Sequence, residues 1–484
     1  MNVRNDEPRD QTGVVLPQQL SVVNVGLPLF GDELREQGVR VADVDWRIPA
    51  GGDETLVRAL TLLYGPAAAT VEVANREAAR RLDEATPALV GVRPAAEVVP
   101  GMAERTVLHP GPPLEWSDFC DPLRRSVLAT AIAEGWAGSS DDAARLVERG
   151  DVTLAPANDH SAALAMATTL GPSAPVLVVH NEPGGTTAYT PLNQGPGERQ
   201  WLGVDSDAAV AHLRWLRDVA GPALGEALAA AGPVDLYSLA AQGVQMGDDI
   251  HMRLQASTNL LIRTLLPHIA ALEDPRRVEL GRFLSENYLF FLNAAIAAAK
   301  ATTEWAAQVP DATLVTGMAR NGTTFGIRLA ATGQRWFTAP APPVEDALYR
   351  GDYGPDDAAP DIGDSAIIEL VGLGGAAAAA SPAVAGFVGG RMADAIDRTR
   401  EVGRVCITQS SRFKIPQLDF EGTPLGVDVR KVVELGIVPA ITTGILDATG
   451  GRGQVGAGLA RAPLACFQQA LLALAETYAP LHTG

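Results

Sequence analysis

The 484-residue chain is acidic, with 38 Lys and Arg against 57 Asp and Glu and a formal net charge of -19. A surface with this charge repels nucleic acid and anionic lipid, so neither a nucleic acid nor a membrane is expected as a partner. The hydrophobic content of 47% and the charged content of 20% are typical of ordered globular proteins. The length predicts roughly two to four domains.

Two further features bear on the compartment and on metals. The three cysteines, Cys120, Cys406 and Cys466, are far apart and lack the close Cys/His spacing of a metal site, so no metal is expected. Two stretches of low charge, 161–179 and 370–390, are interrupted by Gly and Pro and do not predict membrane-spanning helices. We therefore expect a soluble, cytoplasmic protein.

The first part of the chain predicts a polar tail and a small domain. Residues 1–16 have no signal-peptide pattern and are expected to be a disordered tail. Within the domain expected over 17–105, apolar runs at 20–25 and 39–44 predict strands on either side of a helix at 30–37. The turn after the first strand lacks the G-x-G-x-x-G pattern, so this βαβ-like unit is not expected to bind a dinucleotide.

The middle of the chain predicts an α/β domain over 106–205 and a helical subdomain over 206–310. The elements expected in the α/β domain are a helix at 120–134, strands at 151–156 and 175–180, and a loop at 182–197. Apolar residues at helical spacing then define two helical faces. These faces comprise Leu261, Leu265, Ile269 and Leu272, and Leu284, Tyr288, Leu292 and Ile296.

The last part, 311–484, predicts a C-terminal α/β domain with glycine-rich loops. Its expected elements are strands at 325–329, 334–338, 405–408 and 438–442, a glycine-rich loop at 450–458, and a helix at 463–478. The fold class predicted for the whole chain is therefore mixed α/β (an α+β complex), multidomain, with an inserted all-helical subdomain.

The stretch 361–375 predicts a strand, a glycine turn and a helix start. The apolar run 366–371 has the length of a strand, and the alanines at 376–380 favour a helix. Backbone N–H groups of Gly372, Gly374 and Gly375 between them could hold a phosphate or carboxylate. Taken alone, three glycines more often make only a tight turn.

Two other segments place arginines beside turns. Arg452 stands in the loop 450–458 with Arg461 shortly after it, and a guanidinium in such a loop suits an anion, although a mobile surface loop is an equal interpretation. Arg320 and Asn321 precede a predicted strand that carries Arg328. Arg328 could be simply an exposed strand residue.

The segment 245–253 contains two acids, a histidine and an arginine. Asp248 and Asp249 favour a helix N-terminus through capping and the helix dipole. His251, followed by Arg253, could orient a substrate amide or move a proton. A single histidine is more often structural, and both interpretations stay open.

Ordered motifs along most of the chain resemble the AllG (YlbE-like) family. They are Gly111-Pro112-Pro113, Glu134-Gly135-Trp136-Ala137, Gln242-Gly243, Met246-Gly247-Asp248 with His251, Arg320-Asn321-Gly322, Phe325-Gly326-Ile327-Arg328, Arg335-Trp336-Phe337-Thr338-Ala339-Pro340, Gly363-Asp364-Ser365-Ala366-Ile367, Gly453-Gln454, Arg461-Ala462-Pro463 and Cys466-Phe467. The segments 23–30 and 45–52 are similar to part of FdrA-type proteins, which resemble succinyl-CoA synthetase subunits.

The resemblance implies a subunit of a carbamoyltransferase that acts with FdrA-like and AllH-like partners. The family reaction is the phosphorolysis of oxalurate to oxamate and carbamoyl phosphate in allantoin and purine degradation, without a cofactor. Its small anionic ligands are phosphate, carbamoyl phosphate and a ureido acid. A homo-oligomer is a further possibility.

Residue chemistry then assigns roles for such a reaction. The catalytic candidates are His251, Asp248 and Arg320, and replacing Arg320 by Ala is expected to reduce activity without affecting folding. The candidates for substrate and anion binding are Asn321, Arg328, Asp364, Ser365, Gly372, Gly374, Gly375, Arg452, Gly453, Gly456, Gly458 and Arg461.

The chain departs from the family pattern at Asn158-Asp159, Leu254 and Asp447, where imidazole or amide groups are usual. A different ureido-acid substrate is one interpretation of these departures. A non-catalytic scaffold or regulatory subunit that binds the FdrA-like and AllH-like partners is an alternative. A weaker alternative is a CoA-ligase-related enzyme.

Overall fold

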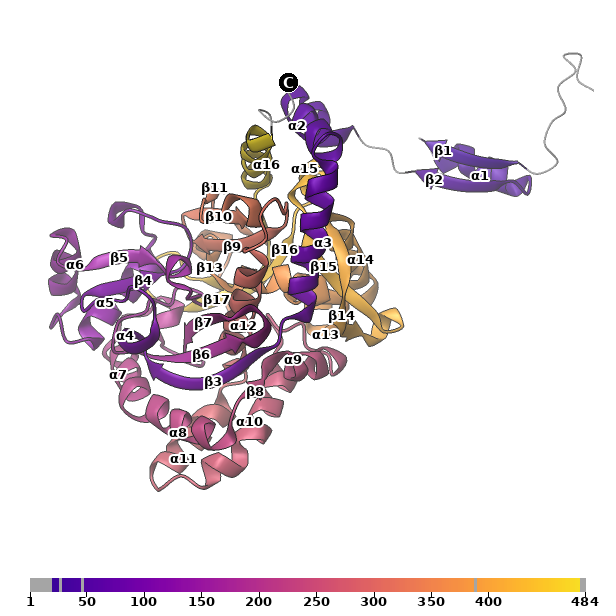
Figure 1. Ribbon diagram of the computed structural model, residues 1–484. Helices are drawn as coiled ribbons and strands as arrows, with labels where there is room; N and C mark the ends of the chain where they lie inside the picture. Colours follow the sequence, from indigo (N-terminus) through magenta and orange to yellow (C-terminus); the bar gives the residue numbers. More distant parts are fainter. Residues whose placement is uncertain (1–19, 26–27, 45–47, 387–389, 479–484) are drawn as a thin grey trace, which may run out of the picture. The chain divides into compact units, whose positions relative to one another are not determined.

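The computed structural model describes residues 20–25, 28–44, 48–386 and 390–478 (Figure 1). The chain divides into two compact units, Met1–Gly52 and Asp53–Gly484. The predicted mixed α/β class is confirmed, with short sheets among many helices. The tail expected at 1–16 lies outside the described residues, and the boundaries expected at 105, 205 and 310 fall inside the second unit and stay predictions.

The first unit is the predicted βαβ arrangement. Strand β1 (Ser21–Val25) pairs in parallel with β2 (Arg40–Val44), and helix α1 (Pro28–Glu36) connects them. Arg35 joins the helix to the second strand through an ion pair with Asp43. The parallel register from Ser21 to Val25 confirms the sequence interpretation of this segment.

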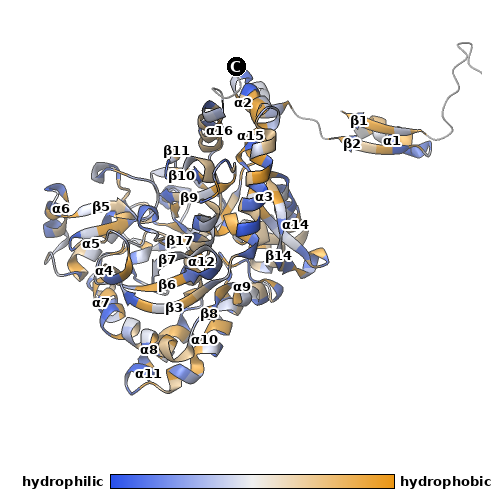
Figure 2. Cartoon of the chain, viewed as in Figure 1, coloured by the Kyte–Doolittle hydropathy of each residue, from blue (hydrophilic) through white to orange (hydrophobic). Residues whose placement is uncertain are grey.

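The second unit begins with two helices and an antiparallel sheet. Asp53 caps α2 by accepting the N–H groups of Thr55 and Leu56. The four-stranded sheet has the order β7-β6-β3-β8, and β3 and β6 are predominantly apolar (Figure 2). These elements are α2 (Glu54–Tyr64), α3 (Ala68–Glu84), β3 (Pro87–Pro94), β6 (Pro175–Asn181), β7 (Thr186–Pro191) and β8 (Val234–Asp235).

Strand β7 corrects the expectation of a long loop over 182–197. Its side chains alternate between buried and partly exposed, and three threonines supply the β-branched character that favours a strand. Pairing with β6 from Asn181↔Thr186 to Val176↔Pro191 satisfies its backbone. Gly184 and Gly185 form the turn before the strand, whereas Gly195 and Gly197 lie in the irregular segment that follows it.

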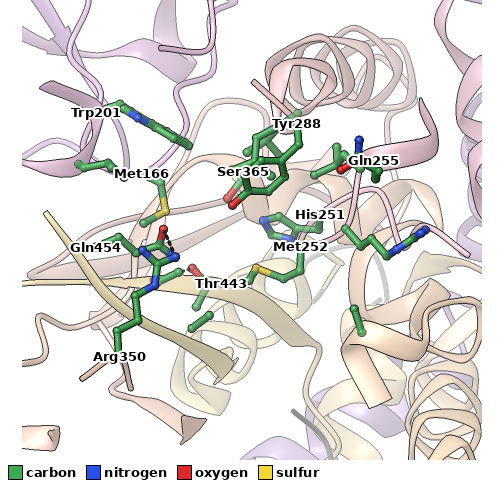
Figure 3. Close-up of a pocket in the computed structure, with 18 residues that line it drawn as sticks. Met166, Trp201, His251, Met252, Gln255, Tyr288, Arg350, Ser365, Thr443 and Gln454 are labelled. Carbon is green, nitrogen blue, oxygen red and sulfur yellow. Dashed lines mark hydrogen bonds between the residues drawn. The ribbon is translucent and has the colours of Figure 1, made fainter. Parts of the chain in front are cut away.

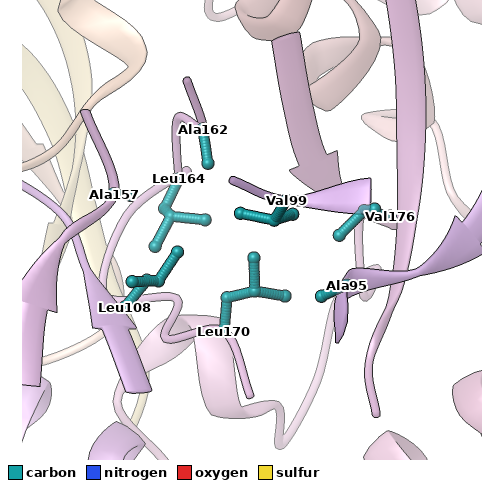
Figure 4. Packing of buried hydrophobic residues seen from close by; sticks show 8 residues of the cluster. All are labelled: Ala95, Val99, Leu108, Ala157, Ala162, Leu164, Leu170 and Val176. Atoms are coloured by element: carbon teal, nitrogen blue, oxygen red, sulfur yellow. The ribbon is translucent and has the colours of Figure 1, made fainter. Parts of the chain in front are cut away.

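A hydrophobic core joins this sheet to a parallel strand pair (Figure 4). The pair consists of β4 (Thr106–His109) and β5 (Thr153–Pro156). The core residues are Ala95, Val99, Leu108, Ala157, Ala162, Leu164, Leu170 and Val176. The surrounding helices are α4 (Ala95–Val98), α5 (Asp121–Ala133) and α6 (Ser140–Glu148). The core therefore crosses the boundary expected at residue 105.

The predicted helical region is present, with one correction. Its helices are α7 (Asp207–Trp215), α8 (Gly221–Ala231), α9 (Leu236–Gln245), α10 (Gln255–Ala270), α11 (Arg276–Glu286) and α12 (Phe290–Ala306). Leu284 and Ile296 do not share one helix, because the chain leaves helical geometry at Asn287 (φ -105, ψ 78). Helix α12 lies at the centre of the second unit, and each of its residues except Glu304 is buried.

The C-terminal region contains two sheets and a hairpin. The sheet β11-β10-β9-β13 consists of β9 (Val315–Asn321), β10 (Thr324–Leu329), β11 (Phe337–Pro340) and β13 (Ile362–Gly363). The sheet β12-β17-β16 consists of β12 (Val344–Tyr349), β16 (Ala440–Leu446) and β17 (Gln454–Arg461). The other elements are β14 (Cys406–Ile415), β15 (Glu421–Val427), α13 (Pro382–Ala385), α14 (Met392–Val405), α15 (Val429–Leu435) and α16 (Leu464–Tyr478).

Both predicted glycine-rich segments differ from expectation. The run 366–371 is not a strand but part of a 3-10 helix, Ser365–Val371, and Gly372 (φ 83) turns the chain toward a second one, Gly374–Ala380. Both short helices are buried throughout, so tertiary packing overrides the strand pattern.

Gly456 and Gly458 lie in strand β17 and not in a loop. A Cβ atom at Gly456 would meet the carbonyl oxygen of Leu348 at 2.8 Å, and one at Gly458 would meet that of Glu345 at 2.7 Å. Glycine is therefore needed at both positions because β12 passes close to β17.

Among the helices in the described ranges, no single one is long and apolar enough to cross a bilayer. Helices α2 and α3, which are bent by 78° at the break between them, pass that test only as a pair, on length and composition.

Candidate functional site

A cavity of about 470 Å³ opens in the second unit (Figure 3). It lies where the helical region meets the sheet β12-β17-β16 and the first 3-10 helix. Its lining residues are Met166, Trp201, Leu202, His251, Met252, Arg253, Leu254, Gln255, Tyr288, Leu289, Leu292, Arg350, Ser365, Ala383, Thr443, Gly444, Gln454 and Ala457. The size is that of a small-molecule site.

The lining is positively charged. It contains Arg253 and Arg350 but no Asp or Glu among the residues named above. Arg253 donates through Nη1 to Asp248 Oδ1 at 2.7 Å, and Arg350 donates through Nη2 to Gln454 Oε1 at 3.3 Å. Both guanidiniums keep further N–H groups that bond to none of the described residues. The cavity therefore favours an anionic ligand.

His251 is held at the cavity by a buried carboxyl group. Its Nδ1 lies 2.9 Å from Glu369 Oε1, and both side chains are less than 5% exposed. Burial, reinforced by the nearby Asp249 carboxyl, raises the pKa of Glu369 well above its usual value. Burial also lowers the pKa of His251 to about 3. Burial therefore favours the uncharged form of both groups.

This protonation state fixes which hydrogen faces the cavity. Glu369 Oε2 accepts the backbone N–H of Gly375, so Oε1 is the oxygen that carries the acid proton and donates it to Nδ1 of His251. The neutral imidazole then carries its own proton on Nε2. Moving the shared proton to Nδ1 leaves the Nε2 proton in place, so His251 presents an N–H donor to the cavity in either arrangement.

The glycine turn supports this pair. The backbone N–H group of Gly375 was predicted to hold an anion. In the structure it donates to the carboxyl group of Glu369. A Cβ atom at Gly374 would meet Glu369 Oε1 at 2.3 Å, and one at Gly372 would meet Thr423 Oγ1 at 2.7 Å. The three glycines do not line the cavity, and Gly374 and Gly375 position Glu369 and hence His251.

The backbone beside His251 is strained. Ile250 has φ 68, which is unfavourable for a β-branched residue, and Met166 on the cavity wall has φ 50. The Asp249 carboxylate holds the tight turn by accepting the N–H groups of Met252 at 3.1 Å and Arg253 at 2.7 Å. Backbone strain of this kind persists only where the surrounding structure maintains it. Such strained residues are common at functional sites.

Asp248 lies behind the cavity wall. Its carboxylate accepts the N–H groups of Ala256 at 3.2 Å and Ser257 at 2.8 Å in the first turn of α10, as the capping interpretation predicted. It also pairs with Arg253. Asp248 is fully buried, so the structure makes it a positioning group for Arg253.

Arg320 is also fully buried, one layer behind the lining. Its Nε donates to Asp361 Oδ2 at 2.7 Å, and Asp361 Oδ1 accepts from Thr443 Oγ1 at 2.9 Å. Its Nη1 donates to Gly363 O at 2.7 Å and to Ser365 Oγ at 3.2 Å, and its Nη2 donates to Thr443 Oγ1 at 3.2 Å. Arg320 therefore orients two hydroxyls of the cavity, Ser365 and Thr443.

Two more candidates are engaged inside the protein and do not line the cavity. Asn321 Oδ1 accepts the N–H groups of Thr323 and Thr324 and so shapes the β9–β10 turn. Asp364 accepts the N–H groups of Gly111 at 2.8 Å and Leu164 at 2.9 Å, and burial raises its pKa to about 7.

Arg328 and Arg452 are each neutralised by an aspartate. Arg328 pairs with Asp159 and lies 4.0 Å from the ring centre of Trp336. Arg452 binds Asp447 with Nε at 2.9 Å and Nη2 at 2.7 Å. These aspartates stand at two of the positions where the chain departs from the family pattern. Of the other departures, Asn158 accepts from Lys300 Nζ, and Leu254 lines the cavity.

The remaining candidates of the second glycine segment lie near the cavity but not on it. Gly453 precedes β17, Gly456 and Gly458 lie in that strand, and Arg461 pairs with Glu345 at 3.4 Å. Their neighbours Gln454 and Ala457 do line the cavity. Of all residues assigned from the sequence, the structure thus brings His251 and Ser365 to the cavity wall.

Sequence reasoning assigned no role to Glu369, Arg350 or the aromatic residues Trp201 and Tyr288. Glu369 carried a usable signal, because an acid inside an apolar run must find a partner when the run is buried. Arg350 directly follows strand β12, and its position in the sequence gave no comparable signal. Trp201 and Tyr288 lie far apart in the sequence, and only the tertiary structure brings them to the same cavity.

Comparison with known proteins gives a consistent family match. The profile described as oxamate carbamoyltransferase subunit AllG matches residues 152–365. The chain is 40% identical over 413 residues to the oxamate carbamoyltransferase subunit AllG of Escherichia coli (strain K12), covering 84% of this chain and 98% of that protein. It is 36% identical over 464 residues to the uncharacterized protein YahG of the same organism, covering 95% and 98%.

A solved structure agrees with these matches. A crystal structure of a conserved protein of unknown function from Enterococcus faecalis V583 superimposes with a TM-score of 0.82 at 36% identity. The similarity covers 84% of this chain and 98% of that one.

Proposed function

The chain belongs to the family of the oxamate carbamoyltransferase subunit AllG, and on this premise we propose that it takes part in carbamoyl transfer between a ureido acid and phosphate. The reaction is the phosphorolysis of oxalurate, or of a related ureido acid, to carbamoyl phosphate and the decarbamoylated product. The observation that carries the proposal is the cavity, where the N–H donor of His251 shares a wall with the free N–H groups of Arg253 and Arg350.

The chemistry needs two anion contacts and one proton transfer. An oxygen of hydrogen phosphate attacks the carbamoyl carbon, the bond from this carbon to the substituted nitrogen breaks, and that nitrogen takes up a proton. Arg253 and Arg350 supply the cations for the phosphate and the carboxylate. The hydroxyl of Ser365, whose oxygen accepts from Arg320, has a proton available for the oxygen that becomes negative, whereas Thr443 already donates its proton to Asp361 Oδ1.

The His251–Glu369 pair can supply the proton. His251 gives the Nε2 proton to the leaving nitrogen while the acid proton of Glu369 moves to Nδ1. The proton lost by hydrogen phosphate then restores the pair. No proton is gained or lost overall, so the cavity needs no exchange with bulk water during the step.

We propose FdrA-like and AllH-like proteins as the partner subunits in the cytoplasm. The word subunit in the family description supports a multi-subunit complex. The presence of His251, Arg253 and Arg350 on the cavity wall supports a direct role in catalysis rather than a scaffold role.

A coupled assay of carbamoyl phosphate formation tests this proposal. The full chain, alone and co-expressed with FdrA-like and AllH-like subunits, is given phosphate and a panel of ureido acids that includes oxalurate. We expect product from at least the co-expressed complex and much slower product formation when His251 is replaced by Asn. Equal product with and without this chain would show that the partners hold the site and would overturn the proposal.

A further inference from the structure

One side of the cavity is apolar and aromatic. Its main members are Trp201, Tyr288 and Leu292. In Figure 3, the rings of Trp201 and Tyr288 lie along the edge of the cavity opposite Arg350 and Gln454. Oxalurate and phosphate have no hydrocarbon group that could bury against such a surface. The apolar side therefore has no use in a reaction of these two compounds alone.

The aromatic side is held rigidly by one buried loop. Trp201 Nε1 donates to Gly195 O at 2.8 Å, and Asn287, which precedes Tyr288, donates from Nδ2 to Asn193 O at 3.0 Å. Asn193 and Asn287 are each 1% exposed. Because both bonds end on residues 193–195, the two aromatic segments keep a fixed separation. A preformed apolar surface of this kind is typical of a ligand site.

The volume of the cavity and the exposure of Tyr288 also indicate a ligand with an apolar group. The volume of about 470 Å³ exceeds the space that a small acid and phosphate require and falls in the range of larger organic ligands. Tyr288 is 43% exposed although it borders the cavity. An apolar group that covered this ring would remove hydrocarbon surface from water and so gain binding free energy.

We propose that the preferred substrate is an N-carbamoyl acid with an apolar or aromatic substituent. The substituent packs between Trp201 and Tyr288, and the carboxylate pairs with Arg350. The bond that breaks joins the carbamoyl carbon to the substituted nitrogen, which leaves as the amine of the free acid after taking a proton from His251. This inference rests on the proposed function and narrows its substrate class.

Calorimetric titration of the full chain with two N-carbamoyl amino acids tests the inference. N-carbamoyl-L-phenylalanine is expected to bind at least about tenfold more tightly than N-carbamoylglycine, since a hydrophobic pocket discriminates by this order. Replacing Tyr288 by Ala should reduce this ratio toward one, whereas the matched Tyr288→Phe variant should keep it. Tyr288 lies in an exposed connection between helices, so neither variant is expected to unfold.

The outcomes separate the two proposals. Equal binding of N-carbamoylglycine, oxalurate and N-carbamoyl-L-phenylalanine would overturn the inference and leave carbamoyl transfer in place. A preference that survives Tyr288→Ala unchanged would also overturn it. If no carbamoyl compound bound, in the presence or absence of phosphate, the inference would fail together with the proposed function.

Discussion

Replacing His251 by Asn is expected to lower kcat for carbamoyl phosphate formation by about 10²–10⁴-fold, because the general acid is lost. KM should change little, since the two arginines that hold the anions remain. Glu369→Gln is the matched variant, because its amide can still donate to Nδ1 but has no proton to release. A smaller loss of kcat is expected for it than for His251→Asn.

These two variants are checked by steady-state kinetics on the complex. Folding is compared with the wild-type chain by circular dichroism and thermal unfolding. If His251→Asn kept a kcat close to that of the wild-type chain, His251 would be a structural residue. If Glu369→Gln lost all activity with a normal fold, the proton transfer through Glu369 would be the dominant contribution of the pair.

Replacing Arg320 by Ala is expected to lower the free energy of unfolding by about 3–5 kcal/mol, because it leaves the fully buried Asp361 carboxylate without its partner. The structure thus revises the expectation that this substitution leaves folding intact. The measurement is chemical denaturation followed by fluorescence. The loss of activity should follow the loss of folded protein. A further loss is expected only if Ser365 and Thr443 change their orientation.

Arg461→Ala is the matched control for this prediction. Arg461 is 36% exposed in its ion pair with Glu345, and pairs of this kind contribute about 1 kcal/mol or less. Equal losses of stability in Arg320→Ala and Arg461→Ala would contradict the structural role of Arg320.

Much of the fold could be predicted from residue patterns. The βαβ segment at the start, α5, α10, β6, β10 and α16 follow directly from apolar periodicity and turn residues. The failures have physical causes. The run from Ala366 to Val371 has the composition of a strand but is buried on all sides, and in that setting packing decides between a strand and a 3-10 helix.

The candidate site was only partly predictable. His251 was a candidate because an imidazole can orient an amide or move a proton, although a single histidine is more often structural. The arginines were chosen because a guanidinium near a glycine turn suits an anion, but a sequence does not show which carboxylate neutralises it. Arg328 and Arg452 are neutralised by Asp159 and Asp447, which lie 169 and 5 residues away in the chain. Arg350 pairs with no carboxylate of the described residues, and Arg253 lines the cavity although it pairs with Asp248, so these two arginines are the better-placed anion ligands.

The most direct test of this account is calorimetric titration of the full chain with oxalurate, whose carboxylate is assigned to Arg350. The wild-type chain should bind it, and Arg350→Ala should weaken the binding by roughly tenfold to a hundredfold, the effect of losing a charged hydrogen bond. Arg461→Ala, in a residue that was also assigned to anion binding from the sequence but lies outside the cavity lining, should leave the affinity unchanged. Loss of binding in Arg461→Ala together with normal binding in Arg350→Ala would contradict the location of the site.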